Sequence, residues 1–176
     1  MMERIAIVGC SGGGKSTLAR AVGERLGLPV VHMDTLFWKP GWVESDADSF
    51  RVLVDEAAAT ERWVMDGGFV SYSAVRFARA DTVIWVDRPM WLCLWRAFAR
   101  MLLNFGHSRA DLAPGCPERF DFAFYLYILN WNRKMRPKVA RALAEQASHA
   151  RIIRLSSDRD TARFLAALEP SPVSPV

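Results

Sequence analysis

The feature that most constrains the fold of this chain is a glycine-rich segment near its N-terminus. Residues 9–16 read Gly-Cys-Ser-Gly-Gly-Gly-Lys-Ser, which is the pattern G-x-x-x-x-G-K-[ST]. The segment follows a short β-branched run, 4–8, and precedes a segment, 15–26, whose apolar residues recur at helical spacing. A strand, a glycine-rich turn and a helix in this order predict a nest of main-chain N–H groups that binds an anion at the helix N-terminus.

This pattern predicts binding of the phosphates of a nucleoside triphosphate. The three consecutive glycines lack the Cβ atoms that would block a tight turn, so their N–H groups can face phosphate oxygens. We expect Lys15 to reach the β- and γ-phosphates and the Ser16 hydroxyl to ligate Mg²⁺. The residues expected to bind the nucleotide are Gly9, Cys10, Ser11, Gly12, Gly13, Gly14, Lys15, Ser16 and Thr17.

Segments typical of strands and of helices alternate along the rest of the chain. The expected strands lie at 4–8, 30–31, 63–65, 82–86 and 151–155. Strands this short and apolar are typical of a parallel sheet that is buried on both faces. The alternation predicts an α/β fold, a three-layer α/β/α sandwich. We expect one domain over residues 1–169 and a disordered tail over 170–176.

Three helix starts can be expected from local signals. Ser45 with Asp48, and Ser157 with Asp160, each look like a capping box before an apolar-periodic segment. Pro89 is expected to open an apolar helix that extends to about residue 103.

Composition limits the class of protein. The 176 residues are 51% hydrophobic and 24% charged, which allows a real core and excludes a disordered chain. Three cysteines without C-x-x-C spacing argue against a disulfide framework and against a structural zinc site. We find no signal peptide and no uncharged apolar run of about 18 residues, so we expect a cytoplasmic protein without a membrane partner. The net charge of +4 fits a phosphorylated small ligand as well as a polyanion.

Aspartates follow three of the predicted strands, where the carboxyl ends of a parallel sheet face the ligand crevice. Asp66 precedes two glycines that leave room for a ligand, so we expect it to hold Mg²⁺ together with Ser16. Asp87, at the end of the fourth strand, is the alternative metal ligand. Asp34 is expected to accept a hydrogen bond from the hydroxyl of an acceptor or to act as its base. His32 is expected to pack at the strand end.

A polar segment rich in glycine and proline, 104–120, interrupts the pattern and predicts a functional lid. Arg96 and Arg100 share a face of the helix before it, and Arg133 and Arg136 follow the helix after it. Positive charge here would stabilise a phosphoryl group in transfer, and a closing lid would exclude water. We expect two or three of these arginines to touch phosphate.

The segment 37–42, Phe-Trp-Lys-Pro-Gly-Trp, forms an aromatic loop. Two interpretations stay open. The two tryptophans could stack on a base or sugar while Lys39 reaches a phosphate, or they could form a hydrophobic cover over the core.

Taken together, these residues resemble the nucleoside monophosphate kinase group, which includes adenylate kinase and, more distantly, shikimate kinase. A closer resemblance, over roughly residues 4–165, is to the bacterial DNA topology modulation proteins. It rests on the segments 32–34, 38–42, 89–96, 115–118 and 130–131. The kinase resemblance implies a five-stranded parallel sheet in the order 2-3-1-4-5 and ATP with Mg²⁺ as the donor. It also implies an acceptor site beyond Asp34 and adenine near Ser157 to Arg159.

The first functional hypothesis is therefore a kinase that transfers the γ-phosphoryl group of ATP to a nucleotide or a small hydroxyl compound. The residues expected to carry catalysis are Lys15, Asp34, Asp66, Arg100, Arg133 and Arg136. The alternative is an ATP-binding regulator that acts on DNA, or a slow ATPase without an acceptor. DNA stays open as a partner, although no sequence-specific DNA-binding motif supports it. The chain is expected to be a monomer or a homodimer.

Overall fold

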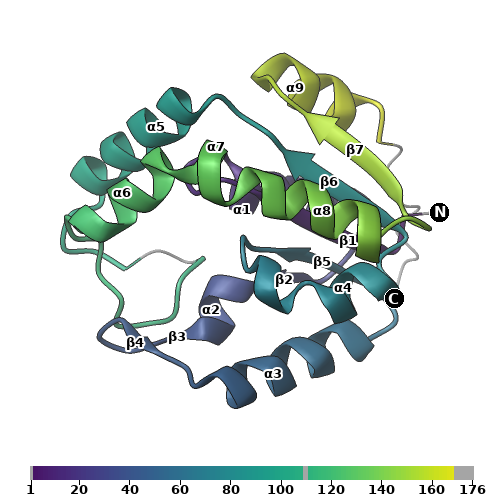
Figure 1. Cartoon of the computed structure of the whole chain (residues 1–176), viewed down its shortest axis with the longest axis horizontal. Coiled ribbons are helices and arrows are strands. Elements are labelled where there is room, and N and C mark those ends of the chain that lie inside the picture. Colours follow the sequence, from purple (N-terminus) through teal and green to yellow (C-terminus); the bar gives the residue numbers. More distant parts are fainter. Residues whose placement is uncertain (1, 109–110, 169–176) are drawn as a thin grey trace.

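A parallel five-stranded sheet forms the centre of the computed structural model, which describes residues 2–108 and 111–168 (Figure 1). The expected tail, 170–176, lies outside the described residues. The sheet strands are β1 (Arg4–Gly9), β2 (Val30–His32), β5 (Trp63–Asp66), β6 (Thr82–Val86) and β7 (Arg151–Leu155). They lie in the order β2-β5-β1-β6-β7. Counted along the chain, these are the five predicted strands in the predicted order.

A second, two-stranded sheet was not predicted. Antiparallel β3 (Trp38–Lys39) and β4 (Val43–Glu44) form a hairpin in the expected aromatic loop, and this hairpin shifts the strand numbering. It follows the short helix α2 (Met33–Phe37), which begins where β2 ends. Strands of only two residues are too short to show a β-type pattern in the sequence.

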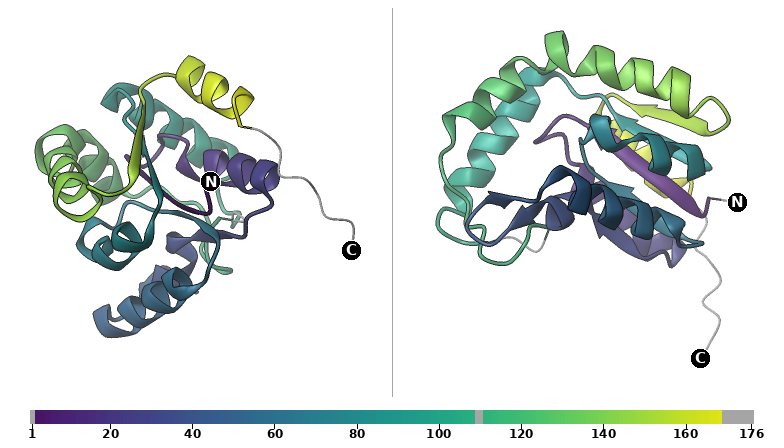
Figure 2. Two further views of the ribbon diagram at one scale, coloured as in Figure 1. Left: turned by 90° about the vertical axis from the view of Figure 1, so that its right-hand side faces the viewer. Right: turned by 60° about the horizontal axis from the view of Figure 1, so that its bottom comes forward.

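Helices cover both faces of the sheet (Figure 2). One face carries α1 (Lys15–Leu26) and α9 (Asp158–Ala166). The other face carries α3 (Ala47–Ala59), α4 (Ala74–Arg79) and α8 (Arg136–Gln146). Alternate residues of β1 belong to the cores on the two faces of the sheet. Ile5 and Ile7 belong to the core beneath α1, and Ala6 and Val8 belong to the core of the other face. This arrangement is the predicted α/β/α sandwich.

The remaining helices lie at the carboxyl end of the sheet. They are the 3₁₀ turn η1 (Val70–Tyr72), α5 (Met90–Leu103), α6 (Phe122–Leu129) and α7 (Trp131–Lys134). Pro89 caps α5, as predicted. Among the described residues, no helix is both long enough and apolar enough to cross a bilayer.

One of the two predicted capping boxes is wrong. Ser157 and Asp160 form the expected reciprocal box at the start of α9. In α3, however, the cap is Asp46, whose Oδ1 accepts a hydrogen bond from the Ser49 N–H at 2.8 Å. Ser45 is buried and its hydroxyl donates to the Leu36 carbonyl instead, because the chain still contacts the end of α2 at that residue.

We expect Asp46→Ala to lower the free energy of unfolding by about 0.5–2 kcal/mol, because α3 loses its N-cap acceptor. Asp48→Ala is the matched control in the same helical turn. Urea titrations followed by circular dichroism compare the two. A larger loss for the Asp48 variant would restore the capping box that the sequence suggested.

Candidate active site

The glycine-rich turn between β1 and α1 has a backbone that only glycine adopts readily. Gly12 has φ +78° and Gly14, which caps α1, has φ +93°. A Cβ atom on Gly12 would also lie 2.1 Å from the carbonyl oxygen of Cys93 on α5. The turn therefore packs closely against α5. Its N–H groups lie at the N-terminus of α1, where the backbone donors have no partner within the helix.

The reactive groups of this turn face in two directions. Ser11, Lys15, Ser16 and Thr17 line the large cavity described below. The Lys15 Nζ donates to the Cys10 carbonyl at 3.0 Å, so the ammonium lies over the turn where phosphates are expected. The Cys10 side chain is buried, hydrogen-bonds with the thiol of Cys93 and is not among the described residues that line that cavity. Its pKa is raised, first by that hydrogen bond and then by burial.

Asp66 is the polar centre of the site. It is buried at the end of β5, and its Oδ2 accepts a hydrogen bond from the Ser16 hydroxyl at 2.9 Å. Its Oδ1 contacts the Nδ1 of His32, so His32 is a partner of Asp66 and not merely a packing residue as the sequence suggested. The hydrogen bond to Asp66 raises the pKa of His32 against the opposing effect of burial. The signal was available, because His32 and Asp66 stand in register on the paired strands β2 and β5.

Arg76, on α4, is a member of the site that the sequence analysis missed. Its side chain is fully buried, and its Nη2 donates to the Gly67 carbonyl at 3.1 Å. Burial lowers its pKa to about 10, and the nearby charge of Asp66 partly opposes that change. Arg76 thus holds the turn after Asp66 in place through its hydrogen bond to the backbone of Gly67.

The carboxylate of Asp87, the alternative metal ligand, accepts hydrogen bonds from two arginines. Arg136 makes a two-point contact, with Nε on Oδ1 and Nη2 on Oδ2, both at 3.0 Å. The Nε of Arg154 donates to Oδ2 at 2.8 Å, and both guanidinium groups lie over the ring of Trp85. The structure thus places Arg136 on Asp87. Arg133 is exposed on α7 and is not among the described residues that line the cavity.

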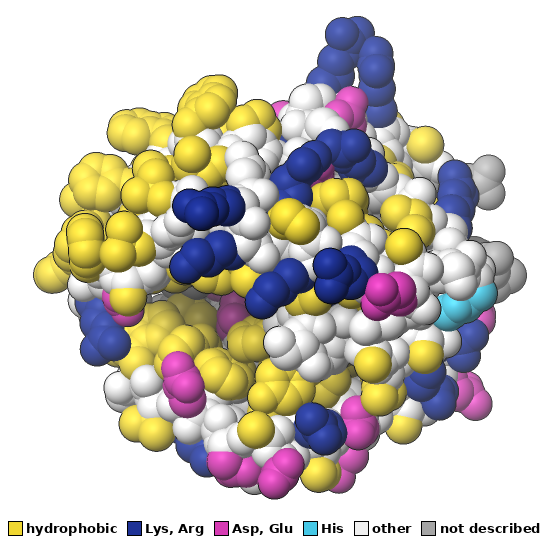
Figure 3. Space-filling view, in the orientation of Figure 1, with side chains coloured by type: hydrophobic (Ala, Val, Ile, Leu, Met, Phe, Trp, Pro, Cys, Tyr) yellow, Lys and Arg dark blue, Asp and Glu magenta, His cyan; other side chains and the backbone are white. Residues whose placement is uncertain are grey.

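A cavity of about 1010 Å³ opens in front of the glycine-rich turn, and its mouth is the hollow seen in Figure 3. Asp34, on the first turn of α2, and Arg100, on α5, both line it. Much of its wall is aromatic, from Trp38, Trp42, Phe69, Tyr72, Phe124 and Tyr127. The structure therefore brings Lys15, Ser16, Asp34 and Arg100 to one cavity, with Asp66 directly behind Ser16.

The aromatic hairpin and the segment 104–120 are bonded to each other. The Gly41 N–H donates to the Gly115 carbonyl at 2.8 Å, and the indole Nε1 of Trp42 donates to the Pro117 carbonyl at 2.8 Å. Leu112, Ala113 and Cys116 form a small core against Trp38 and Trp42. The two tryptophans thus cover a hydrophobic cluster and also line the cavity. Stacking on a base or sugar stays a prediction.

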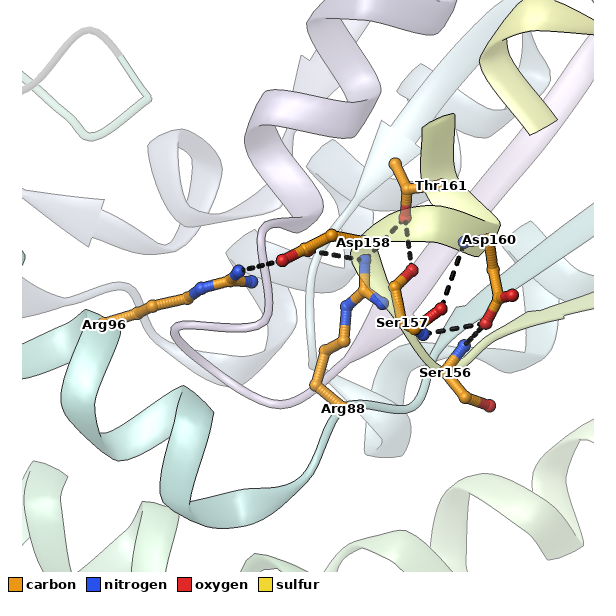
Figure 4. Close-up of polar contacts among 7 residues, drawn as sticks. All are labelled: Arg88, Arg96, Ser156, Ser157, Asp158, Asp160 and Thr161. Atoms are coloured by element: carbon orange, nitrogen blue, oxygen red, sulfur yellow. Dashed lines mark hydrogen bonds and ion pairs between the residues drawn. The ribbon is translucent and has the colours of Figure 1, made fainter. Parts of the chain in front are cut away.

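Arg96 and Arg100 of α5 bind carboxylates on two different elements. The Nε of Arg100 lies 3.0 Å from the Oε1 of Glu118, which brings the segment 104–120 against α5. The Nη2 of Arg96 donates to the Asp158 Oδ2 at 2.6 Å, toward α9 (Figure 4). Arg88, which is almost fully buried, reaches the same carboxylate at 3.2 Å and the Thr161 hydroxyl at 2.6 Å.

These residues border a second cavity, of about 340 Å³, on the other side of the turn. Gly13, Gly14 and Thr17 form its floor, and Asp158 and Thr161 of α9 lie at its edge. It therefore lies at the place where the sequence analysis expected a purine base, next to residues 157–159. Arg96 lines both cavities.

No protein-family model and no curated protein matches this chain, but solved structures do. The shikimate kinase from Acinetobacter baumannii in complex with shikimate is similar with a TM-score of 0.59 and 18% identity, over 94% of this chain and 89% of that one. A gluconokinase from Sinorhizobium meliloti 1021 gives 0.53 and 17%, over 94% and 93%. A sugar kinase from Janibacter sp. HTCC2649 gives 0.51 and 17%, over 98% and 97%.

The chain shares its α/β/α fold with these kinases. At this level of identity the likeness establishes the fold and leaves the substrate to be argued from the site. In this fold, the glycine-rich turn and residues of the segment 104–120 line one cavity at the carboxyl edge of the sheet, and Asp66 lies behind Ser16.

The bonds at Asp87 predict a pH-dependent contribution to stability. Burial alone would raise the pKa of Asp87, but the hydrogen bonds from Arg136 and Arg154 outweigh it and hold the pKa below its ordinary value. A lowered pKa stabilises the fold above the unfolded value of about 3.9, and this stability is lost as the pH falls through the folded pKa.

We therefore expect Asp87→Asn to destabilise the protein most at neutral pH. The difference in unfolding free energy from the unmodified protein should shrink below about pH 4. Urea unfolding at a series of pH values measures it. A difference that stays constant over the whole series would show that the charge of Asp87 contributes nothing.

Proposed function

We propose that this protein is a kinase that transfers the γ-phosphoryl group of ATP to a hydroxyl group of a small molecule or nucleotide. The observation that carries the proposal is the convergence of Lys15, Ser16, Asp34 and Arg100 on one cavity in front of the P-loop turn. A phosphate nest and a carboxylate for the acceptor are the two parts that phosphoryl transfer to a hydroxyl requires.

The glycine-rich turn between β1 and α1, which we call the P-loop, binds the ATP donor. The N–H groups of the turn and of the first residues of α1 bind the β- and γ-phosphates, and Lys15 exchanges the Cys10 carbonyl for phosphate oxygens. The base of ATP takes the smaller cavity, between the turn and α9, where the sequence analysis placed adenine.

The residues present fit Mg²⁺. The Ser16 hydroxyl and the Asp66 carboxylate are hard oxygen donors 2.9 Å apart beside the phosphate nest. In the described part of the chain, no three His, Cys, Asp or Glu side chains gather as a metal site. Mg²⁺ takes few protein ligands and completes its shell with phosphates and water. Bound Mg²⁺ would neutralise charge on the β- and γ-phosphate oxygens.

The acceptor half rests on Asp34 and the aromatic walls. Asp34 accepts a hydrogen bond from the acceptor hydroxyl and so points its oxygen at the γ-phosphorus. Arg100 lines the same cavity and supplies positive charge for the phosphoryl group in transfer. The aromatic side chains, with the segment 104–120 as a lid bonded to the hairpin, keep water from competing as acceptor.

The class of acceptor is supported by the neighbours as well as by the cavity. The similar structures are named as a shikimate kinase, a gluconokinase and a sugar kinase. We therefore place cyclic and open-chain polyhydroxy compounds first and nucleotides second. The finer resemblance to DNA topology modulation proteins and a role on DNA stay predictions from the sequence.

Lys15→Ala should lower the rate of ATP turnover by at least about 10²-fold, since removal of one preorganised charge from a transition state costs that much or more. Lys138→Ala, which removes an exposed lysine from α8, is the control and should keep the full rate. Release of ADP measures both variants. Equal rates for the two would contradict the assignment of the phosphate site.

Asp66→Asn should weaken Mg²⁺-dependent turnover more than it weakens nucleotide binding without Mg²⁺. Asp87→Asn should affect stability and leave the Mg²⁺ dependence unchanged, because its carboxylate faces Arg136 and Arg154. Titrating Mg²⁺ in a turnover assay, beside calorimetry with ATP alone, separates the two effects. The reverse pattern would move the metal role to Asp87.

A screen of polyhydroxy compounds and nucleotides for ATP-to-ADP conversion above background hydrolysis identifies the acceptor. We expect a hit whose stimulation is lost in Asp34→Asn while ATP binding is kept. If no compound stimulates turnover and the protein binds DNA with a steep salt dependence, the DNA-acting regulator is the better description.

A further inference from the structure

Helix α5 has three faces, and one of them has no partner among the residues that the structure describes. Its inner side packs into the core through Cys93, Ala97 and Met101. Arg96 and Arg100 lie on the side that lines the cavities. The outer side presents an apolar stripe at spacings of four, three and four residues, made of Trp91, Trp95, Phe98 and Leu102. Trp91 is 66% exposed and Trp95 62%, which is unusual for a side chain of this size.

Helix α6, which packs beside α5, adds to the same surface. Its sequence, Phe-Ala-Phe-Tyr-Leu-Tyr-Ile-Leu, contains no charged residue. A helix that is apolar on every side is expected to be buried. Nevertheless Phe122 is 67% exposed, and Leu126 and Leu129 are exposed one and two turns further on.

The exposed side chains of the two helices form one continuous surface. The ring centroid of Tyr125 lies 6.4 Å from that of Phe98 on α5 and 5.1 Å from that of Phe120, which joins the helices and the end of the connecting segment. Hydrophobic side chains gather over α5 and α6 in Figure 3. We call this surface the α5–α6 face. It consists of Trp91, Trp95, Phe98, Leu102, Leu103, Phe120, Phe122, Leu126 and Leu129.

The size of the α5–α6 face exceeds what a monomer normally exposes. A whole aromatic side chain presents roughly 150–250 Å², so the exposed parts of these side chains amount to on the order of 1000 Å². The largest apolar patch of a typical monomer measures about 300–600 Å². A standard protein–protein interface buries about 800 Å² on each partner. The face is therefore large enough to be one half of a stable interface.

We propose that the α5–α6 face is covered by a second copy of this chain, in a two-fold symmetric dimer. A two-fold interface brings the same patch of each copy together, so the patch must complement itself. An apolar patch without charge does so, because no like charges meet when it faces itself. Two adjacent helices with regular ridges of side chains are also a shape that packs well against its own copy.

The proposed interface and the active site share these two helices. Arg96 and Arg100 project from the cavity side of α5, and Phe124 and Tyr127 of α6 line the same cavity. A dimer that covers the outer side would fix both helices in place around the cavity. The proposal itself does not depend on the reaction catalysed, and it can be tested without an activity assay.

Sedimentation velocity on the full chain tests the proposal. At about 100 μM, a dimer of even micromolar affinity is almost completely formed. We expect the unmodified protein to sediment at twice the chain mass of 19.8 kDa. The variant Trp95→Glu with Leu102→Glu should sediment as a monomer, because it brings like charges together at the centre of the interface. Val52→Glu, at an exposed apolar residue of α3, is the matched control and should remain a dimer.

A milder variant guards against loss of folding. Leu103→Ser changes a side chain that is 83% exposed, so it should leave the circular dichroism spectrum unchanged while weakening the dimer at least about tenfold. An unmodified protein that is monomeric at 100 μM would overturn the proposal. A dimer that persists in both folded face variants would overturn it too. Binding of the monomer to anionic lipid vesicles through this face would assign the face to a membrane surface instead.

Discussion

The close approach of the P-loop turn to α5 is the constraint on which the rest of the site depends. Gly12 leaves no space between its Cα and the carbonyl of Cys93. Because the turn and the helix touch at this point, the position of the phosphate nest also fixes the position of α5. The two arginines of α5 are then held at a set distance from the nest, with Arg100 at the larger cavity and Arg96 at both. A side chain at residue 12 would separate the turn from α5 and disturb both cavities at once.

A second level of organisation comes from Asp66, which connects three elements at the carboxyl edge of the sheet. Ser16 brings in α1, His32 brings in β2, and the turn after Asp66 rests on the buried guanidinium of Arg76. A buried carboxylate is costly unless it is paired and hydrogen-bonded, and here Ser16 and His32 each bind one of its oxygens. Ser16, which we propose as a Mg²⁺ ligand, therefore also helps to keep Asp66 buried.

The sequence predicted the sheet and the P-loop well because both depend on short, local patterns. The order of the five strands followed from a resemblance, and the position of Asp66 followed from its place at a strand end. Arg76 was missed, since a lone arginine in a six-residue helix looks like a surface charge until the helix is known to lie behind Asp66. The pairing of Arg136 with Asp87 was missed for a related reason. Each had been assigned a separate role, and only the fold shows that they bind each other.

The position of Arg96 between the two cavities ties the surroundings of one to the wall of the other. Its guanidinium is held by Asp158 on the side of the smaller cavity, yet the same side chain borders the larger one. Any change in the partners of Asp158 would therefore also alter the wall of the larger cavity. The two compartments are linked through one guanidinium group, without a longer chain of contacts.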